Sequence, residues 1–200
     1  MTDPNLSGSI MPTGEEAPPG YELFNQKQAA PTDIIVNSVF VSQLAEIEVV
    51  ELEQLRQLAM RGIVESIGTT HEDLSFEEEL NILPGTDDSD RMLFRAYRDH
   101  RLVGYALLVI GWPKREDWVI QHMIINPENR LQGIGTAIVS TVESYARHSQ
   151  SPDKVCLSAI PIDQSGRSFW ALRGYTDEPA TYQVPIAGEV KEILVVKKCL

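Results

Sequence analysis

The sequence predicts an α+β fold, built on a mixed, mostly antiparallel sheet of six or seven strands with helices at its sides. Two observations lead to this fold class. Three strand-like runs follow one another between residues 91 and 125 with short connections, which predicts an antiparallel meander. A further strand-like run over 154–160 follows an amphipathic helical run over 134–148, and a helical crossover joins strands that run parallel.

The composition suits one domain, with 200 residues of which 42% are hydrophobic. Residues 1–33 hold five of the twelve prolines, which predicts an extended arm ahead of a domain over 34–200. No apolar run approaches the length of a membrane span and no signal-peptide pattern opens the chain, so we expect a cytoplasmic protein. Cys156 and Cys199 are too few for a disulfide framework, and no Cys/His cluster has zinc spacing, so we expect reduced thiols and no metal.

Three elements are expected in the first third of the chain. Residues 34–41 are a short β-rich run that predicts an additional edge strand. Residues 46–50 alternate in polarity, which is typical of a half-buried strand. A helix over 51–66 is predicted by apolar residues at helical spacing, namely Leu52, Leu55, Ala59 and Ile63.

An acidic segment follows, because residues 65–90 carry nine Asp or Glu and no Lys or Arg. Within it Ser75 and Glu78 fit a capping box, which predicts a short helix that ends before Pro84. The net charge of −12 argues against nucleic acid as a partner, because phosphate binding requires a basic face. It favours either a cationic partner or nothing more than solubility.

The meander consists of strands expected over 91–97 and 102–110, with a tight turn at 98–101 between them, and a third strand over 118–125. Beyond the helix at 134–148, a second short helix is expected over 163–172 and is ended by Gly174. A last strand is expected over 190–197, with 181–184 as its hairpin partner.

Gly133 and Gly135 lie where the third strand of the meander gives way to the helix at 134–148. A helix start leaves backbone N–H groups unpaired and carries the positive end of the helix dipole, so it binds phosphate. Arg130 adds a permanent cation. A dinucleotide-binding loop would need a glycine where Ile138 stands, and no Gly-Lys-Ser/Thr of a Walker loop follows, so both of those sites are excluded.

The spacing Arg130-x-x-Gly133-x-Gly135 resembles the pyrophosphate loop of the GCN5-related N-acetyltransferases (GNAT). The stretch from Asp163 to Tyr175 resembles the later motif of the same family, Asn-x-x-Ala-x-x-aromatic-Tyr-x-x-x-Gly-Phe. The element order matches that family over about residues 45–198, so the resemblance implies the GNAT fold with splayed central parallel strands. The departures are Asp163 for Asn, Gly166 for Ala and Trp170 for a tyrosine that often protonates the leaving thiolate.

The resemblance implies acetyl-CoA as cosubstrate and no metal. The pantetheine arm would lie where the strand at 118–125 splays from the strand at 154–160, and backbone N–H groups near Ile124 and Ile125 would hold the arm and polarise the acyl oxygen. Residues 132–136 would hold the pyrophosphate. The candidate cofactor-binding residues are Ile124, Ile125, Arg130, Leu131, Gln132, Gly133, Ile134, Gly135, Thr136, Asp163 and Trp170.

The sequence does not identify clearly which residues act as general base and general acid. The family often places a glutamate or histidine on the strand before the loop, and here Gln121 occupies the commonest position although an amide is not a base. His122 is the candidate base, but strand alternation turns it to the other face unless a bulge re-aims it. A water chain to bulk solvent is the alternative. An indole cannot act as the acid, so we expect Trp170 to form a wall of the site.

The resulting hypothesis is an acyl-CoA-dependent N-acyltransferase that moves an acetyl group to a primary amine of a small molecule or peptide. The acidic segment indicates that this acceptor is cationic. The alternative is a non-catalytic acyl-CoA sensor or interaction module, which Gln121 and Trp170 favour. A toxin that acetylates aminoacyl-tRNA is disfavoured by the acidic balance. We expect no nucleic-acid or membrane partner, and a homodimer is compatible with the resemblance because paired association is common among such proteins.

Overall fold

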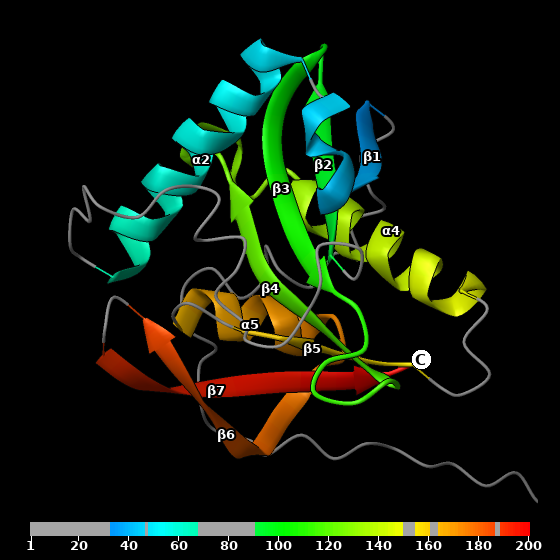
Figure 1. The fold of residues 1–200 in the computed structure, drawn as a ribbon, viewed down its shortest axis with the longest axis vertical. Helices are drawn as coiled ribbons and strands as arrows, with labels where there is room; N and C mark the ends of the chain where they lie inside the picture. The colour runs from blue at the N-terminus through cyan, green and yellow to red at the C-terminus, as the bar shows by residue number, and fades with distance from the viewer. Residues whose placement is uncertain (1–32, 47, 68–90, 150–154, 161–163, 187–188) are drawn as a thin grey trace, which may run out of the picture.

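The computed structural model describes residues 33–46, 48–67, 91–149, 155–160, 164–186 and 189–200. Seven strands form one sheet in the order β1-β2-β3-β4-β5-β7-β6 (Figure 1). The strands are β1 Ile34–Phe40, β2 Arg91–Arg98, β3 Arg101–Val109, β4 Asp117–Ile125, β5 Cys156–Ala159, β6 Thr176–Ile186 and β7 Glu189–Cys199. The helices are η1 Val41–Glu46, α2 Val49–Ile67, η3 Pro127–Asn129, α4 Ile134–His148 and α5 Gln164–Leu172.

The sheet is mixed, as the sequence predicted. The pairs β1–β2, β2–β3, β3–β4, β5–β7 and β6–β7 are antiparallel, and the pair β4–β5 is parallel. The parallel pair arises because α4 carries the chain back along the sheet between the two strands. The element order and the single parallel pair confirm the predicted fold class.

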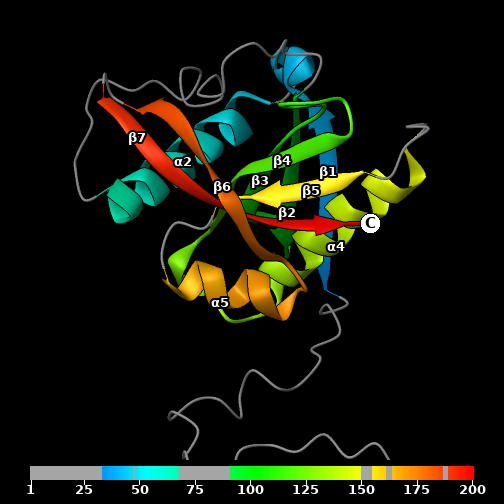
Figure 2. The ribbon, with the colours of Figure 1, turned by 90° about the horizontal axis from the view of Figure 1, so that it is seen from below.

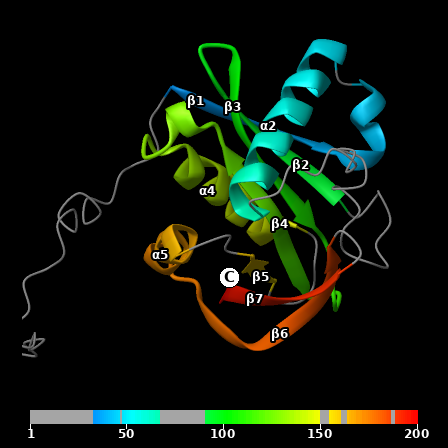
Figure 3. The same cartoon turned by 90° about the vertical axis from the view of Figure 1, so that its left-hand side faces the viewer.

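Helices cover both faces of the sheet, with α2 on one side and α4 and α5 on the other (Figures 2 and 3). The amphipathic pattern of α4 buries Ile134, Ile138 and Val142 in a core cluster that includes Phe94 and Ile120 of the sheet. A second cluster on the opposite face holds Leu55, Leu58, Leu93, Leu107 and Ile124. Because the side chains of a strand alternate between faces, membership in one of these two clusters shows to which face of the sheet a strand residue points.

Several predicted elements are confirmed. The helix expected over 134–148 is α4 with the same bounds, and the edge strand, the hairpin at 98–101 and the final hairpin are all present. The hairpin turns at Asp99 and His100, whose φ values of 49° and 60° are the left-handed pair that a two-residue hairpin requires. The helix expected over 51–66 is α2, which is longer by a residue or two at each end.

The strand predicted over 46–50 is wrong. A 3₁₀ helix ends at Glu46 and α2 already begins at Val49. Five residues are too short to separate period 2 from period 3.6, and the apolar positions at this point also continue the spacing of α2. The helix predicted from the capping box and the arm over 1–32 lie outside the described residues.

The expectation of two reduced thiols is also wrong, because Cys156 and Cys199 are joined in a disulfide. The two residues lie opposite each other in the antiparallel pair of β5 and β7. A separation of 43 residues gives no sign of this proximity, which only the sheet order creates.

Candidate active site

The parallel strands β4 and β5 separate in the middle of the sheet. Their pairing covers Asp117 to Ile120 on β4 and Cys156 to Ala159 on β5, and it ends at the pair Ile120 and Ala159. Beyond that point β4 continues to Ile125 along β3 alone. Within the described residues, the β5-facing edge of β4 therefore has no strand partner over 121–125, so a ligand could lie along that edge in place of a strand.

A β-bulge lies on β4 at the point where the two strands separate. Leu107 of β3 pairs with His122, whereas Leu108 pairs with Ile120, so Gln121 is the additional residue. Residues that pair across two strands project to the same face, and Leu107 belongs to the cluster on the α2 side. His122 therefore points to the α2 face, and the bulge that the sequence analysis considered is present at this residue.

The side chains of Gln121 and His122 are in contact. The amide Nε2 of Gln121 lies 2.8 Å from Nε2 of the imidazole, and Gln121 is buried while His122 is half-buried. An amide nitrogen donates only, so this contact requires a lone pair on Nε2 of His122 and places the proton of a neutral ring on Nδ1. With Nε2 occupied by the amide of Gln121, the ring can accept a proton at that atom only when this contact opens.

The backbone of Ile125, more than that of Ile124, faces the open edge of β4. The N–H of Asn126 donates to the carbonyl of Val103 on β3 at 2.9 Å, and in an antiparallel ladder every second residue bonds to the same partner. Ile124 therefore also faces β3, and Ile125 faces away from it. The Nε of Arg130 confirms this direction, because it donates to the carbonyl of Ile125 at 3.3 Å.

The loop after β4 ends at an open helix N-terminus. Leu131 and Gly133 both have left-handed backbones, with φ values of 59° and 82°. Gly133 is the N-cap of α4 and supplies no side-chain cap, and the first turn of this fully described helix holds no acidic residue. The N–H groups of Ile134, Gly135 and Thr136 precede the first helical bond, from Ala137 to the carbonyl of Gly133. This end presents donors and a positive dipole to an anion.

Gly135 has a packing role that the sequence analysis did not predict. A Cβ at this position would lie 3.3 Å from two ring atoms of Phe169 on α5. The absence of a side chain at Gly135 thus lets the start of α4 lie against α5. The neighbouring Trp170 is 3% exposed and packs edge to face against Tyr175, with ring centroids 4.8 Å apart, so it is a core residue at the base of the two helices. Asp163 lies outside the described residues.

Arg98, at the end of β2, contacts the loop and was missed by sequence reasoning. Its NH1 donates to the side-chain oxygen of Gln132, and its NH2 lies 3.4 Å from the Gln132 carbonyl oxygen. Its Nε is 2.9 Å from a carboxylate oxygen of Asp33, just ahead of β1. No sequence signal could have shown this contact, since the three residues come from separate parts of the chain and meet only in the sheet order.

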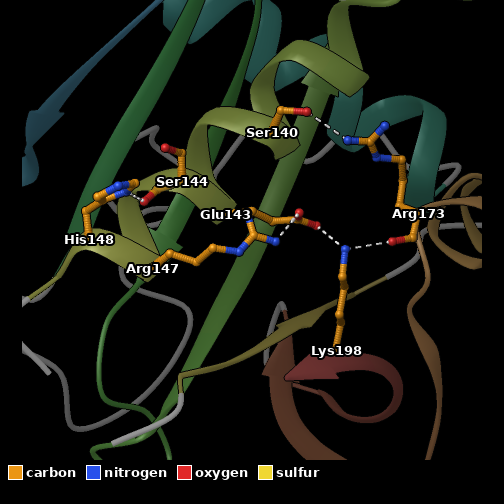
Figure 4. Close-up of polar contacts among 7 residues, drawn as sticks. All are labelled: Ser140, Glu143, Ser144, Arg147, His148, Arg173 and Lys198. Atoms are coloured by element: carbon orange, nitrogen blue, oxygen red, sulfur yellow. Dashed lines mark hydrogen bonds and ion pairs between the residues drawn. The ribbon is translucent and has the colours of Figure 1, made fainter. Parts of the chain in front are cut away.

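A second polar cluster lies in the C-terminal half of α4 (Figure 4). The buried carboxylate of Glu143 is 2.8 Å from Nζ of Lys198 and 3.2 Å from NH2 of Arg147. Lys198 also donates to the carbonyl of Arg173 at 2.9 Å, and Arg173 donates to Oγ of Ser140 at 2.8 Å. These contacts attach the end of β7 and the turn after α5 to α4, so their role is structural.

Burial raises the pKa of the Tyr175 phenol, and the negative charge of the nearby Glu143 raises it further. The ring lies in the core beneath Lys198, whose Nζ is 5.6 Å from its centroid. A phenol held protonated inside the core is a packing residue.

The described residues contain no group of three or more His, Cys, Asp or Glu side chains that could hold a metal ion. None of their helices combines the length and the apolar character that crossing a bilayer would take.

The comparison with known families decides the family. The sequence profile described as the acetyltransferase (GNAT) family matches residues 52–175, which is more than half of the chain. The chain belongs to the GNAT acetyltransferase family. The match runs from α2 to Tyr175, the residue before β6, so it includes the bulge, the open edge of β4 and the loop before α4 in this GNAT protein. Among proteins of curated function, none matches the sequence.

Solved structures show the same fold. Escherichia coli ElaA is 20% identical with a TM-score of 0.56, over 82% of this chain and 99% of ElaA. An acetyltransferase from Streptococcus agalactiae is 15% identical with a TM-score of 0.59, over 84% and 99% of the two chains. The PaiA N-acetyltransferase of Thermoplasma acidophilum, solved in complex with coenzyme A, is 16% identical with a TM-score of 0.55, over 84% and 99%. Acyl-CoA-dependent acyl transfer is the chemistry consistent with this family.

Proposed function

We propose that the protein transfers an acetyl group from acetyl-CoA to a primary amine, by direct attack within a ternary complex. The observation that carries the proposal is that three features of the chain follow one another in the same order as three parts of acetyl-CoA. The bulge at Gln121, the open edge of β4 and the uncapped start of α4 follow one another along the chain from residue 121 to residue 136. A thioester, an extended arm and a pyrophosphate follow one another in the same order along acetyl-CoA.

The residues of the loop fit the anionic end of the cosubstrate. The amides of Ile134, Gly135 and Thr136 are available to the pyrophosphate because no side chain caps α4 at Gly133. Arg130 supplies a cation beside them, and Leu131 and Gln132 complete the loop. The outward-facing backbone of Ile125 would hold the pantetheine amide groups, whereas Ile124 contributes its buried side chain to the core. The proposal also keeps Asp163, which lies outside the described residues, and Trp170 of α5, whose buried indole would form a wall of the site.

The reaction needs one bond formed, one broken and two proton movements. The neutral amine attacks the thioester carbonyl, the C–N bond forms, and the C–S bond breaks as the tetrahedral adduct collapses. The nitrogen of the adduct then loses its extra proton, which passes through water to the leaving thiolate, so that CoA leaves as the thiol. His122 would accept the proton that the ammonium acceptor must lose, because it lies at the bulge on the α2 face; the Gln121 amide must first release Nε2 of the ring. Alignment of the two substrates supplies much of the remaining rate.

The acceptor in this proposal is a cationic small molecule or peptide. The net charge of −12 and the nine acidic residues over 65–90 create a negative potential that concentrates amines. We also retain a cytoplasmic location and the exclusion of nucleic acid in the proposal, on the composition alone.

A second candidate function is favoured by one contact. Nε2 of His122 is occupied by the amide of Gln121, and Trp170 is a core residue, so neither is free to exchange protons as placed. An acyl-CoA sensor would need the cofactor loop and no proton acceptor. Both functions require CoA binding, but only the acetyltransferase turns over acetyl-CoA in the presence of an amine.

The experiment that separates them measures thiol release from acetyl-CoA with a panel of amines, next to calorimetric titration of CoA. The proposal expects CoA binding and amine-dependent thiol release, with cationic amines best. CoA binding without turnover of any amine supports the sensor, and a protein that binds no CoA rules out both functions.

A further inference from the structure

The end of the β2–β3 hairpin lies against the loop that precedes α4, and Arg98 makes the contact. Only 17% of its side chain is exposed, so the guanidinium is held between two parts of the protein. On one side it is paired with Asp33 at 2.9 Å. On the other side it donates to both the side-chain oxygen and the main-chain oxygen of Gln132. The planar fork of an arginine suits such a two-point contact, which an ammonium group cannot reproduce.

Gln132 lies in the part of the loop where the backbone is left-handed on both sides. It lies between Leu131 and Gly133, which both have left-handed backbones, and Leu131 is 83% exposed. A leucine in this conformation is strained, because its Cβ crowds the following carbonyl. The loop offers Gln132 one bond of its own, from Nε2 to the carbonyl of Glu128 at 2.9 Å. The left-handed backbone of Leu131 and Gly133 is therefore stabilised by a residue outside the loop, because Arg98 holds Gln132 between them.

We propose that Arg98 is a positioning residue for the CoA phosphates. It acts through Gln132, holding the turn from Leu131 to Gly133 in the shape that directs the amides of α4 at the pyrophosphate. Asp33 holds Arg98, so the edge of the sheet at β1 becomes part of the cofactor site. This inference rests on the proposed function, since it assigns a role in binding the cosubstrate named there.

The first test compares four variants by calorimetric titration with CoA and by thermal unfolding. Arg98→Ala should raise the Kd for CoA about tenfold, while kcat at saturating acetyl-CoA stays within a factor of two, because the reacting groups are untouched. Arg98→Lys keeps the charge and loses the fork, so it should recover little of the affinity. Asp33→Asn should raise the Kd several-fold. The matched control is Arg101→Ala, which removes a charge from the exposed end of the same hairpin and should leave the Kd unchanged.

The second test asks whether Arg98 acts through Gln132. In a Gln132→Ala background, the further loss of affinity caused by Arg98→Ala should fall below threefold, because the side-chain contact is already gone. A full tenfold loss in that background would show that Arg98 touches the phosphates directly and would overturn the positioning role. Full affinity in Arg98→Lys, or equal losses in Arg98→Ala and Arg101→Ala, would overturn it too, since charge alone would then suffice. If wild-type protein binds no CoA, both the proposed function and this inference are wrong. If wild-type protein binds CoA and Arg98→Ala binds it equally well, only this inference is wrong.

Discussion

Gln121 and His122 are consecutive residues of one strand, yet their side chains meet, with the amide nitrogen 2.8 Å from Nε2 of the ring. In a regular strand, successive side chains point to opposite faces and could not meet in this way. The bulge at Gln121 removes that constraint. It brings an imidazole to the point where β4 and β5 separate, where the proposed function needs a group that takes a proton from the acceptor.

The first prediction concerns His122. His122→Ala should lower kcat by about a hundredfold or more, the usual range for one general base, with the Kd for CoA unchanged. It should also remove the rise of kcat/KM with pH that a neutral imidazole produces. A pH–rate profile that keeps its shape in His122→Ala would instead assign the proton to a water chain.

The second prediction concerns Gly133, whose φ of 82° only glycine and, at some cost, asparagine adopt readily. Gly133→Val should weaken CoA binding by tenfold or more, on the order of 1.4 kcal/mol. The variant Gly133→Asn separates two reasons for this loss. If only the backbone matters, asparagine should restore most of the affinity; if a side chain collides with the pyrophosphate, asparagine should lose it as valine does. Calorimetry that finds wild-type affinity in both variants would remove the loop from the cofactor site.

The third prediction concerns Trp170, which is buried against Phe169 and Tyr175. Since it is a core residue, Trp170→Phe should lower thermal stability and leave thiol release per folded molecule within about tenfold of wild type, because an indole supplies no acid. Circular dichroism melting and steady-state kinetics measure the two effects. A drop of several orders of magnitude in kcat at unchanged CoA affinity would contradict this role.

The sequence was sufficient where local pattern and global fold agree. The period of 3.6 in α4, the two-residue turn at Asp99 and the glycine pair at the start of α4 are local features, and each appears where the pattern indicated. Pattern failed over 46–50, where five residues fit both a strand and a helix. It was silent about the contact between Arg98 and Gln132, because a contact between a hairpin and a distant loop depends on the order of the strands. The bulge at Gln121 was foreseeable only as an option, since no residue type marks it.

The fourth prediction concerns the disulfide of Cys156 and Cys199, which closes a loop of 43 residues. In the chain-entropy account of cross-links, a loop of that length contributes about 4 kcal/mol to the free energy of unfolding. Reduction should therefore lower Tm by roughly 8 to 16 °C at about 2–4 °C per kcal/mol. Because Cys199 is exposed, a thiol reductant should reach the bond without unfolding the protein.

The control for the disulfide is the double variant Cys156→Ser with Cys199→Ser, whose Tm should not respond to reductant. Wild-type protein that shows two titratable thiols in the native state, with the same Tm before and after reductant, would contradict the bond. It would also return the protein to the reduced form expected from composition, which a reducing compartment favours.

The last prediction ranks two charges on α4. Glu143 has 7% of its side chain exposed and faces Lys198, which has 25% exposed, whereas Arg147 is 50% exposed and makes an i,i+4 pair. Removing the carboxylate leaves the ammonium of Lys198 without its counter-charge in a mostly dry site. Glu143→Gln should therefore lower the free energy of unfolding by about 1–3 kcal/mol, reduced from the cost of breaking a fully buried pair because Lys198 is partly solvated and keeps the Arg173 carbonyl. Arg147→Ala should lower the free energy of unfolding by about 0.5 kcal/mol or less.

Neither change should alter the Kd for CoA, because Glu143 lies nine residues along the helix from Ile134, about 14 Å at 1.5 Å per residue. Urea unfolding with calorimetry on the same samples measures both quantities. A larger loss in Arg147→Ala than in Glu143→Gln, or a changed CoA affinity in Glu143→Gln at full folding, would show that this cluster does more than attach β7 to α4.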